Sequence, residues 1–308
     1  MKDSILKDRL PNDPVWQHHY FKSDDVTIHY VRQGTGKPVL LLHGWPGFWY
    51  DWRYVIEPLS KDADVIAPDF RGFGESDKPD VNPIDGYTPD HFAKDIISLL
   101  DELHVEKVLI VAHDIGATIA QLIAKKYPQY VDSLVLLNPP YNGIGIRRFD
   151  PAIQGQFWYQ HFHNLHWAGD LIGYNEDTVR LYLTHFYQTW TGKKEALRPK
   201  ELDAIIQSYA KDEGMKRSIN YYKARAQAKT QAVVQKQAGI EEKIPHTTHV
   251  LWGEADPVIL VDWSDKLYDY FDEYTLKRLP GIGHFVSFEA PEEVVETVKK
   301  ARNKAIDR

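Results

Sequence analysis

The sequence predicts an α/β fold in which a mostly parallel β-sheet carries helices on both faces and is interrupted by an all-helical insertion. The first 140 residues alternate short apolar runs with helical patterns, which is typical of a parallel sheet. Residues 140–229 contain helical patterns alone, and the alternation of strands and helices then resumes. We therefore expect a core domain formed by residues 1–139 and 230–308, and a helical cap (lid) domain formed by residues 140–229.

Short apolar runs define the expected strands. Four of them are too short for a typical helix and are apolar enough for a strand buried on both faces. They cover residues 39–42, 65–68, 108–112 and 134–137. Two further strands are expected after the insertion, at residues 249–253 and 274–279.

The expected helices follow from apolar residues at helical spacing and from capping signals. Such spacing predicts helices over residues 92–103 and 117–127, the second ended by Pro128. Within the insertion, Asn175 is a suitable N-cap, and Pro199 is suitable for the first turn of a helix that we expect to reach Gly214. The core is expected to close with helices over residues 263–271 and from Pro291 onward.

Composition excludes several classes of function. The 308 residues include no cysteine, so no disulfide, thiolate metal site or cysteine nucleophile is possible. The net charge is −7, from 37 basic and 44 acidic side chains, and this argues against a nucleic-acid partner. No apolar run approaches the length of about 18 residues that a membrane-spanning helix needs, and no signal-peptide pattern begins the chain. We expect a cytoplasmic protein without membrane insertion, whose partners are small and uncharged.

The segment Ala112-His113-Asp114-Ile115-Gly116 lies where a predicted strand meets a predicted helix. Its spacing is that of a nucleophile elbow, in which small flanking residues allow a turn so sharp that the middle residue is strained. This pattern predicts Asp114 as a nucleophile. The alternative is that Asp114 only caps the following helix.

A second segment, His43-Gly44-Trp45-Pro46-Gly47, follows the strand at residues 39–42. A tight Trp-Pro turn, with a cis peptide as one option, can direct the backbone N–H of Trp45 into the same space as the N–H of Ile115. Two such donors form an oxyanion hole. An ordinary strand-ending turn remains the alternative.

A histidine and a carboxylate follow the last two predicted strands. Within Gly281-Ile282-Gly283-His284-Phe285, flexible glycines can place His284 over the strand ends near Asp114. Asp256 can orient that imidazole through its Nδ1–H, with Glu254 as the competing carboxylate. The order of nucleophile, acid and histidine along the chain is that of α/β-hydrolases.

With these motifs in place, the chain resembles the epoxide hydrolase branch of the α/β-hydrolases. The resemblance also covers Asp69-Phe70-Arg71-Gly72-Phe73-Gly74-Glu75-Ser76 and the helical insertion. An Asp nucleophile suits displacement at a saturated carbon, which leaves an ester that water later cleaves. The resemblance implies conversion of a small apolar epoxide and water to a vicinal diol through an ester on Asp114. It implies no cofactor and no metal, and a monomer or homodimer.

Two tyrosines of the insertion complete the site that the resemblance implies. The segments Phe157–Phe162 and Asn220–Ala224 are similar to the family's two cap motifs, and carry-over by position selects Tyr159 and Tyr222 as ring-opening donors. The residue beside the second one, Tyr221, points about 100° away on a helix, so only one of the two can face the nucleophile.

Three alternatives stay open. The first is a dehalogenase that uses the same Asp, His and Asp. Haloacid dehalogenases typically have Arg directly after the nucleophile and again one turn later, where this chain has Ile115 and Thr118; haloalkane dehalogenases have Asn and Trp where Trp45 and Ile115 stand. The second is a non-catalytic ligand receptor of the same fold. The third, a metal site at His161, His163 and His166, is disfavoured because no carboxylate accompanies them.

Overall fold

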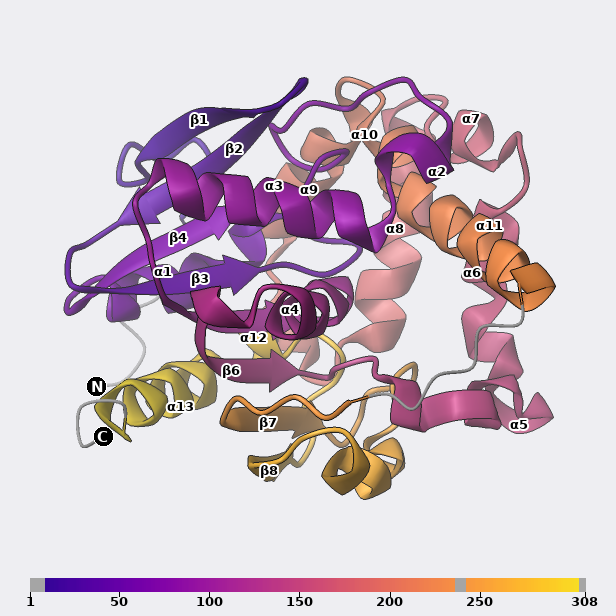
Figure 1. Cartoon of the computed structure of the whole chain (residues 1–308). Coiled ribbons are helices and arrows are strands. Elements are labelled where there is room, and N and C mark those ends of the chain that lie inside the picture. Colours follow the sequence, from indigo (N-terminus) through magenta and orange to yellow (C-terminus); the bar gives the residue numbers. More distant parts are fainter. Residues whose placement is uncertain (1–8, 236–241, 305–308) are drawn as a thin grey trace.

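The computed structural model of the protein describes residues 9–235 and 242–304. Within them, eight strands form one sheet in the order β1-β2-β4-β3-β5-β6-β7-β8 (Figure 1). Pairing is parallel from β4 through β3 to β8 and antiparallel at β1 and β2. The strands are β1 (His18–Ser23), β2 (Val26–Gln33), β3 (Lys37–Leu42), β4 (Ala63–Pro68), β5 (Val108–His113), β6 (Val131–Leu137), β7 (Thr248–Gly253) and β8 (Tyr274–Leu279).

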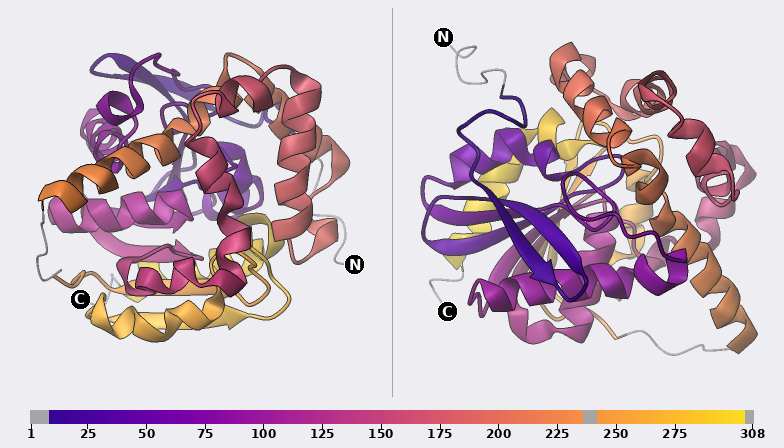
Figure 2. Two further views of the ribbon diagram at one scale, coloured as in Figure 1. Left: turned by 90° about the vertical axis from the view of Figure 1, so that its right-hand side faces the viewer. Right: turned by 90° about the horizontal axis from the view of Figure 1, so that it is seen from above.

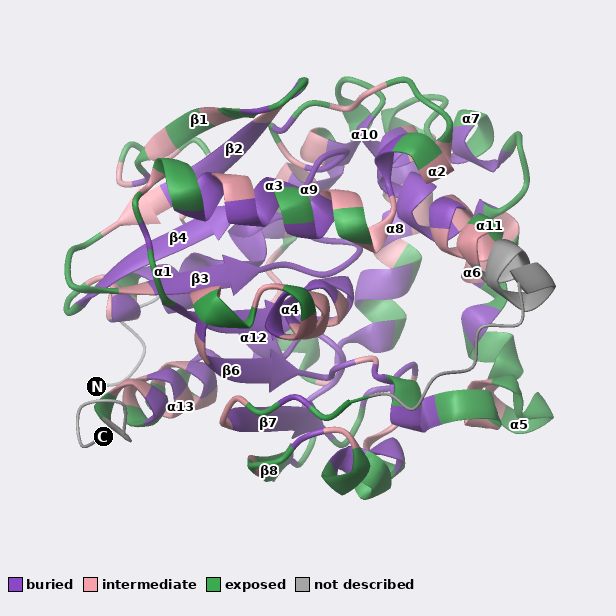
Figure 3. Cartoon of the chain, in the orientation of Figure 1, coloured by how far each residue is buried: buried purple, intermediate pink, exposed green. Residues whose placement is uncertain are grey.

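Helices cover both faces of the sheet, which confirms the predicted fold class. Helices α3 (Pro89–Glu102) and α4 (Ile115–Lys126) contact each other on one face, while α1 (Arg53–Leu59) and α13 (Pro291–Lys304) contact each other on the opposite face (Figure 2). This double cover explains why every residue of β4, β5 and β7 is buried (Figure 3). Two short helices, α2 (Pro83–Gly86) and α12 (Val286–Glu289), complete the core.

Between β6 and β7 the described chain is helical and lies beyond the carboxyl ends of the parallel strands (Figure 1). We call helices α5–α11 the helical cap segment; the last of them extends past the predicted boundary at residue 229. They are α5 (Pro151–Gln154), α6 (Trp158–His163), α7 (Ala168–Ile172), α8 (Glu176–Trp190), α9 (Pro199–Ala210), α10 (Gly214–Ser218) and α11 (Asn220–Gln235). Loops at the carboxyl ends of parallel strands are where ligands bind in such sheets, so the cap segment covers the expected site.

The structure differs from what the sequence predicted at three places. The hairpin of β1 and β2 was not predicted, because β1 is a half-exposed edge strand without an apolar run. The helix that begins at Pro199 ends at Ala210 instead of Gly214, since Asp212 and Glu213 adopt positive φ angles that break the helix. The predicted helix over 263–271 is a 3₁₀ helix over Val261–Asp269. The N-cap at Asn175 is confirmed: its side chain accepts a hydrogen bond from the N–H of Thr178, 2.9 Å away.

No helix among the described residues combines the length and the apolar character needed to cross a membrane.

Candidate active site

The backbone at Asp114 has the sharp turn that the elbow pattern predicts. Asp114 joins β5 to α4 with φ 48° and ψ −116°, a strained conformation for a residue with a side chain. A Cβ added at Gly116 would lie 2.4 Å from the carbonyl oxygen of Leu42, and one added at Gly44 would lie 2.7 Å from the Cβ of Asp114. Small residues are therefore required around the turn. The Asp114 side chain accepts no hydrogen bond from the second or third residue of α4, as an N-cap side chain would, so the capping alternative is not supported.

Two backbone N–H groups point at the Asp114 carboxylate. The N–H of Trp45 donates to Oδ1 over 3.1 Å, and the N–H of Ile115 donates to the same carboxylate. The Trp45–Pro46 peptide is cis, the option that the sequence analysis left open. Because both donors point at this carboxylate, they can also stabilise negative charge that develops on it during a reaction.

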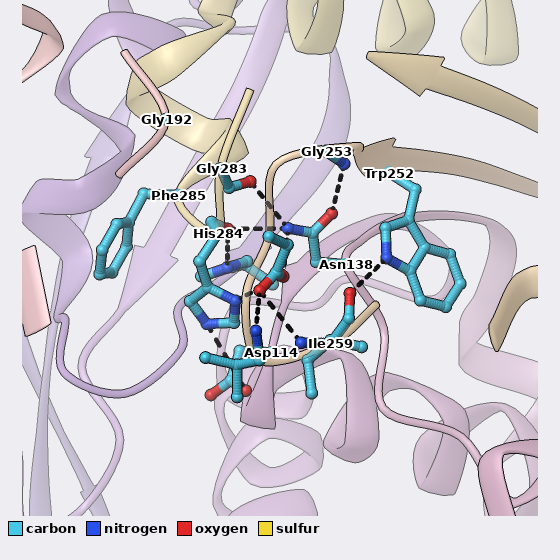
Figure 4. A network of polar contacts seen from close by, with 12 residues as sticks. Asp114, Asn138, Gly192, Trp252, Gly253, Ile259, Gly283, His284 and Phe285 are labelled. Atoms are coloured by element: carbon cyan, nitrogen blue, oxygen red, sulfur yellow. Dashed lines mark hydrogen bonds and ion pairs between the residues drawn. The ribbon is translucent and has the colours of Figure 1, made fainter. Parts of the chain in front are cut away.

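His284 lies between two carboxylates, those of Asp114 and Asp256; Figure 4 shows it beside Asp114. Its Nδ1 is 2.8 Å from Asp256 Oδ2, and its Nε2 is 3.8 Å from Asp114 Oδ2. A carboxylate only accepts, so Nδ1 carries a proton, and in the neutral ring Nε2 is left as a base. This Nε2 is buried and has no hydrogen-bond partner in the described part of the chain. Glu254, the competing carboxylate, is exposed.

Burial and charge shift the pKa values of these groups in ways that suit proton transfer. Burial raises the pKa of Asp114, and the charge of His284 together with the two N–H donors opposes that rise. For His284, burial lowers the pKa, but the charge and hydrogen bond of Asp256 and the charge of Asp114 outweigh it, so the pKa is raised. Each group therefore favours the charged form of its partner.

Asn138 belongs to this network, although the sequence analysis missed it. It follows β6 with φ 42°, and its Nδ2 donates to Asp256 Oδ2 over 2.7 Å and to the carbonyl of Gly283 over 3.0 Å (Figure 4). Its Oδ1 accepts from the N–H of Gly253 over 2.7 Å. The amide thus joins three strand-end loops. The sequence did offer one signal: Asn138 directly follows the apolar run at residues 134–137, so it is a polar residue at the carboxyl end of a predicted strand.

Glu289 was also missed; it anchors the loop that carries His284. The carboxylate is 2% exposed and accepts four backbone N–H groups from this loop and from the cap segment. The donors are Gly192 (2.8 Å), Lys193 (2.9 Å) and Gly283 (2.9 Å) to Oε2, and Phe285 (3.1 Å) to Oε1. One side chain therefore joins the His284 loop to a part of the cap segment that lies 97 positions before Glu289.

We expect Glu289→Gln to destabilise the protein by about 2–3 kcal/mol, because an amide cannot present two acceptor oxygens to four N–H groups. Thermal unfolding should show a fall in Tm of about 5 °C or more. Glu292→Gln, a change at an exposed acidic residue of α13, is the control and should leave the Tm within about 1 °C. An unchanged Tm for Glu289→Gln would show that this carboxylate does not anchor the loop.

Tyr159 of α6 and Tyr222 of α11 line the same small cavity, of about 70 Å³, as Asp114. Their ring centroids are 5.6 Å apart and their hydroxyls are hydrogen-bonded to each other; the ring of Trp45 packs against both. Burial raises the pKa of each tyrosine, so both remain protonated donors. Tyr221 does not line the cavity; its ring packs against Phe92. The choice of Tyr222 over Tyr221, made by resemblance, agrees with this packing.

Among the described residues, no metal site is formed by the three histidines considered in the sequence analysis, His161, His163 and His166. His163 is buried and its Nε2 lies 2.8 Å from the Tyr182 hydroxyl, while His161 and His166 are exposed. In the described residues, potential ligand atoms do meet at His18, His29 and Glu75, all within 4.8 Å of one another. There, His18 Nδ1 is hydrogen-bonded to His29 Nε2 over 2.8 Å, and Glu75 accepts from Tyr20 over 2.5 Å. None of these residues lines the cavity at Asp114.

The chain is similar to known proteins in sequence and in fold. Residues 37–291 match the family described as alpha/beta hydrolase fold. The chain is 30% identical to epoxide hydrolase 1 of Caenorhabditis elegans over 296 residues, 94% of this chain and 71% of that protein. It is 29% identical to epoxide hydrolase 4 of Homo sapiens, over 92% of this chain and 78% of that one. Among solved structures, epoxide hydrolase CorEH without ligand superposes with a TM-score of 0.80 at 26% identity, covering 92% of this chain and 98% of the other.

Proposed function

Because the chain belongs to the α/β-hydrolase superfamily and, within it, to the epoxide hydrolase family, we propose that it converts an epoxide to a vicinal diol through a covalent ester on Asp114. One observation carries the proposal: Asp114 and the paired hydroxyls of Tyr159 and Tyr222 line one cavity. A carboxylate nucleophile and two protonated hydroxyl donors are the groups that opening of an epoxide requires.

In the first half-reaction, a carboxylate oxygen of Asp114 attacks a ring carbon, and the bond from that carbon to the epoxide oxygen breaks. The oxygen leaves as an alkoxide that takes a proton from one of the two tyrosine hydroxyls. An alkyl ester on Asp114 and a tyrosinate result. The second tyrosine stabilises this charge through the hydrogen bond between the hydroxyls.

In the second half-reaction, His284 takes a proton from a water molecule that attacks the ester carbonyl of Asp114. The N–H groups of Trp45 and Ile115 receive the oxyanion, and the diol leaves when its ester oxygen regains a proton from His284. The proton released by the re-formed Asp114 carboxyl returns to the tyrosinate, so the enzyme is regenerated. Ester formation also removes the negative charge of Asp114 that raises the pKa of His284, and this favours the neutral, basic imidazole when it is needed.

A single turnover in H₂¹⁸O tests this mechanism. With enzyme in excess over a styrene-oxide-like epoxide, the first diol should contain no ¹⁸O, and the label should appear in the Asp114 carboxylate. Label in the first diol would show direct attack by water. Release of halide from a haloalkane, without diol from any epoxide, would identify a dehalogenase, and absence of both activities would favour the receptor alternative.

We expect Tyr159→Phe and Tyr222→Phe each to lower kcat/KM for a neutral epoxide about 10²-fold, because each removes a hydrogen-bond donor to the developing alkoxide. Steady-state diol formation measures the effect. Tyr221→Phe is the matched control, since its ring lies outside the cavity, and it should stay within about threefold of the wild type. Equal losses in all three variants would contradict the roles assigned to the pair.

We expect the ester to accumulate at low pH. His284 must be neutral to take a proton from water. In the ester the charge of Asp114 is gone, but the charge and hydrogen bond of Asp256 still favour the protonated imidazole, so the neutral fraction declines as pH is lowered. Ester formation needs only an ionised Asp114, which a protonated His284 favours. Rapid quench should show a bound-ester fraction that rises as pH is lowered from about 8 to about 5. A fraction that falls over this range would contradict the assignment of His284 as the base.

A further inference from the structure

Two arginines line the cavity that contains Asp114. They are Arg148, in the 3₁₀ segment Asn142–Phe149, and Arg225, in α11. Together with Tyr222, both also line an adjoining cavity of about 300 Å³ that reaches His161. We call the cavity at Asp114 the inner cavity and the adjoining one the outer cavity. Both arginines line both cavities and therefore lie where the two adjoin. A molecule that extends from the nucleophile toward the outer cavity passes them.

No carboxylate pairs with either guanidinium among the side chains that the structure describes. The Nε of Arg148 is buried without a hydrogen-bond partner, whereas the adjacent Arg147 is ion-paired with Asp265 at 2.7 Å. Arg225 donates to the Tyr221 hydroxyl over 3.4 Å and lies over the ring of that tyrosine, at 5.5 Å from its centroid.

The positive charge of Arg225 acts on Arg148, whereas the pKa of Arg225 itself is raised, first by Tyr221. Burial and then the charge of Arg225 lower the pKa of Arg148. Like charges held close together in a partly buried site are costly, and an anion between them offsets that cost. Among the residues that line the inner cavity, Asp114 is the one carboxylate. The site thus contains two cations and one anion before any substrate enters.

We propose that Arg148 and Arg225 form an anion subsite that selects epoxides bearing a carboxylate on the oxirane ring or close to it. The inference rests on the proposed function. A carboxylate matches the planar fork of a guanidinium. Its negative charge, added to that of Asp114, would also neutralise the two positive charges of the arginines. The carboxylate must be close to the ring, because both arginines line the same small cavity as the nucleophile. This substrate class differs from the uncharged partner that composition led us to expect.

The subsite lies on α11 and on the 3₁₀ segment Asn142–Phe149 that precedes the cap segment, rather than on α4. Ile115 and Thr118, the positions at which the haloacid dehalogenase pattern has arginines, also line the cavity, but they contribute no charge. Positive charge comes instead from Arg148 and Arg225, which belong to segments that lie before and after most of the cap helices. The residues proposed to recognise the anion are therefore different from the residues assigned to the chemical steps.

The test compares oxirane-2-carboxylate with oxirane-2-carboxamide, which has the same shape without the charge. Wild-type enzyme should prefer the acid in kcat/KM by about thirtyfold or more. Arg148→Gln and Arg225→Gln should each remove most of that preference while they leave amide hydrolysis within about threefold, which also shows that the variants fold. Arg147→Gln is the matched control and should keep the preference of the wild type.

Further outcomes distinguish failure of the proposed anion subsite from failure of the proposed epoxide hydrolase function. A wild type that hydrolyses the amide as well as the acid, or a preference unchanged in both Gln variants, overturns the subsite and leaves the epoxide hydrolase assignment intact. If neither epoxide is hydrolysed, the anion subsite can still be tested without turnover. The measurement is then calorimetric binding of 2,3-dihydroxypropanoate, the diol that corresponds to oxirane-2-carboxylate. Binding that weakens about thirtyfold in Arg148→Gln supports the subsite, and equal binding in the variant and the wild type, or none in either, overturns it.

Discussion

Replacing Asp114 by Asn is expected to abolish epoxide turnover while leaving the protein at least as stable as the wild type. The amide has nearly the shape of the carboxylate, so the turn at φ 48° and the contacts to Trp45 and Ile115 can be kept. It lacks the nucleophilic oxygen anion, and loss of the nucleophile in a covalent mechanism costs on the order of 10⁴-fold or more in kcat.

The expected stability of the Asp114→Asn variant follows from the direction in which the pKa of Asp114 is shifted. Burial raises the pKa of Asp114 in the folded protein, so its ionised form is less favourable there than in the unfolded chain, and at neutral pH this lowers stability. Asn removes that cost, although it also removes a counter-charge from His284. Thermal unfolding at pH 7 should therefore give a Tm equal to or above that of the wild type.

Asp51→Asn is the matched control for Asp114→Asn. Asp51 is also buried, at 2% exposed, and burial raises its pKa to about 7, but it does not line the cavity. Its substitution should spare stability in the same way and keep turnover within about tenfold of the wild type. If Asp114→Asn kept more than about 1% of the activity, attack by this carboxylate would be excluded.

Local patterns predicted the parts of the fold and site that depend on neighbouring residues. The buried runs at β3, β4, β5 and β6 are strands because both of their faces are covered, and the spacing around Asp114 marks a turn that large side chains cannot enter. His284 and Asp256 were found through their order along the chain, and the structure brings them together with Asp114.

Residues that act through distant contacts could not be found in this way. Asn138 bonds to a carboxylate 118 positions away, and Glu289 bonds to backbone groups 96 and 97 positions away. Arg148 and Arg225 line the cavity only because the 3₁₀ segment Asn142–Phe149 and α11, far apart in the sequence, both reach it. Helical periodicity separates Tyr221 from Tyr222 by direction, but only the packing of α11 shows which one faces Asp114.

Replacing His284 by Gln is expected to stop the reaction after its first half. Attack by Asp114 on the epoxide does not need a base, so the ester should still form, whereas its hydrolysis loses the group that takes a proton from water. We expect kcat to fall about 10³- to 10⁴-fold and intact-mass spectrometry to show a protein heavier by the mass of one epoxide. Peptide mapping should place the added mass on Asp114.

Two further variants make this result specific. Asp114→Asn/His284→Gln should form no adduct, which would separate the ester from alkylation of any other side chain. Asp256→Asn should give a smaller defect than His284→Gln, because the imidazole remains and loses only the carboxylate, 2.8 Å away, that orients it and raises its pKa. Full activity of His284→Gln without an adduct would overturn the two-step mechanism. An adduct in the double variant would instead move the nucleophile away from Asp114, so the four proteins together identify both the nucleophile and the base.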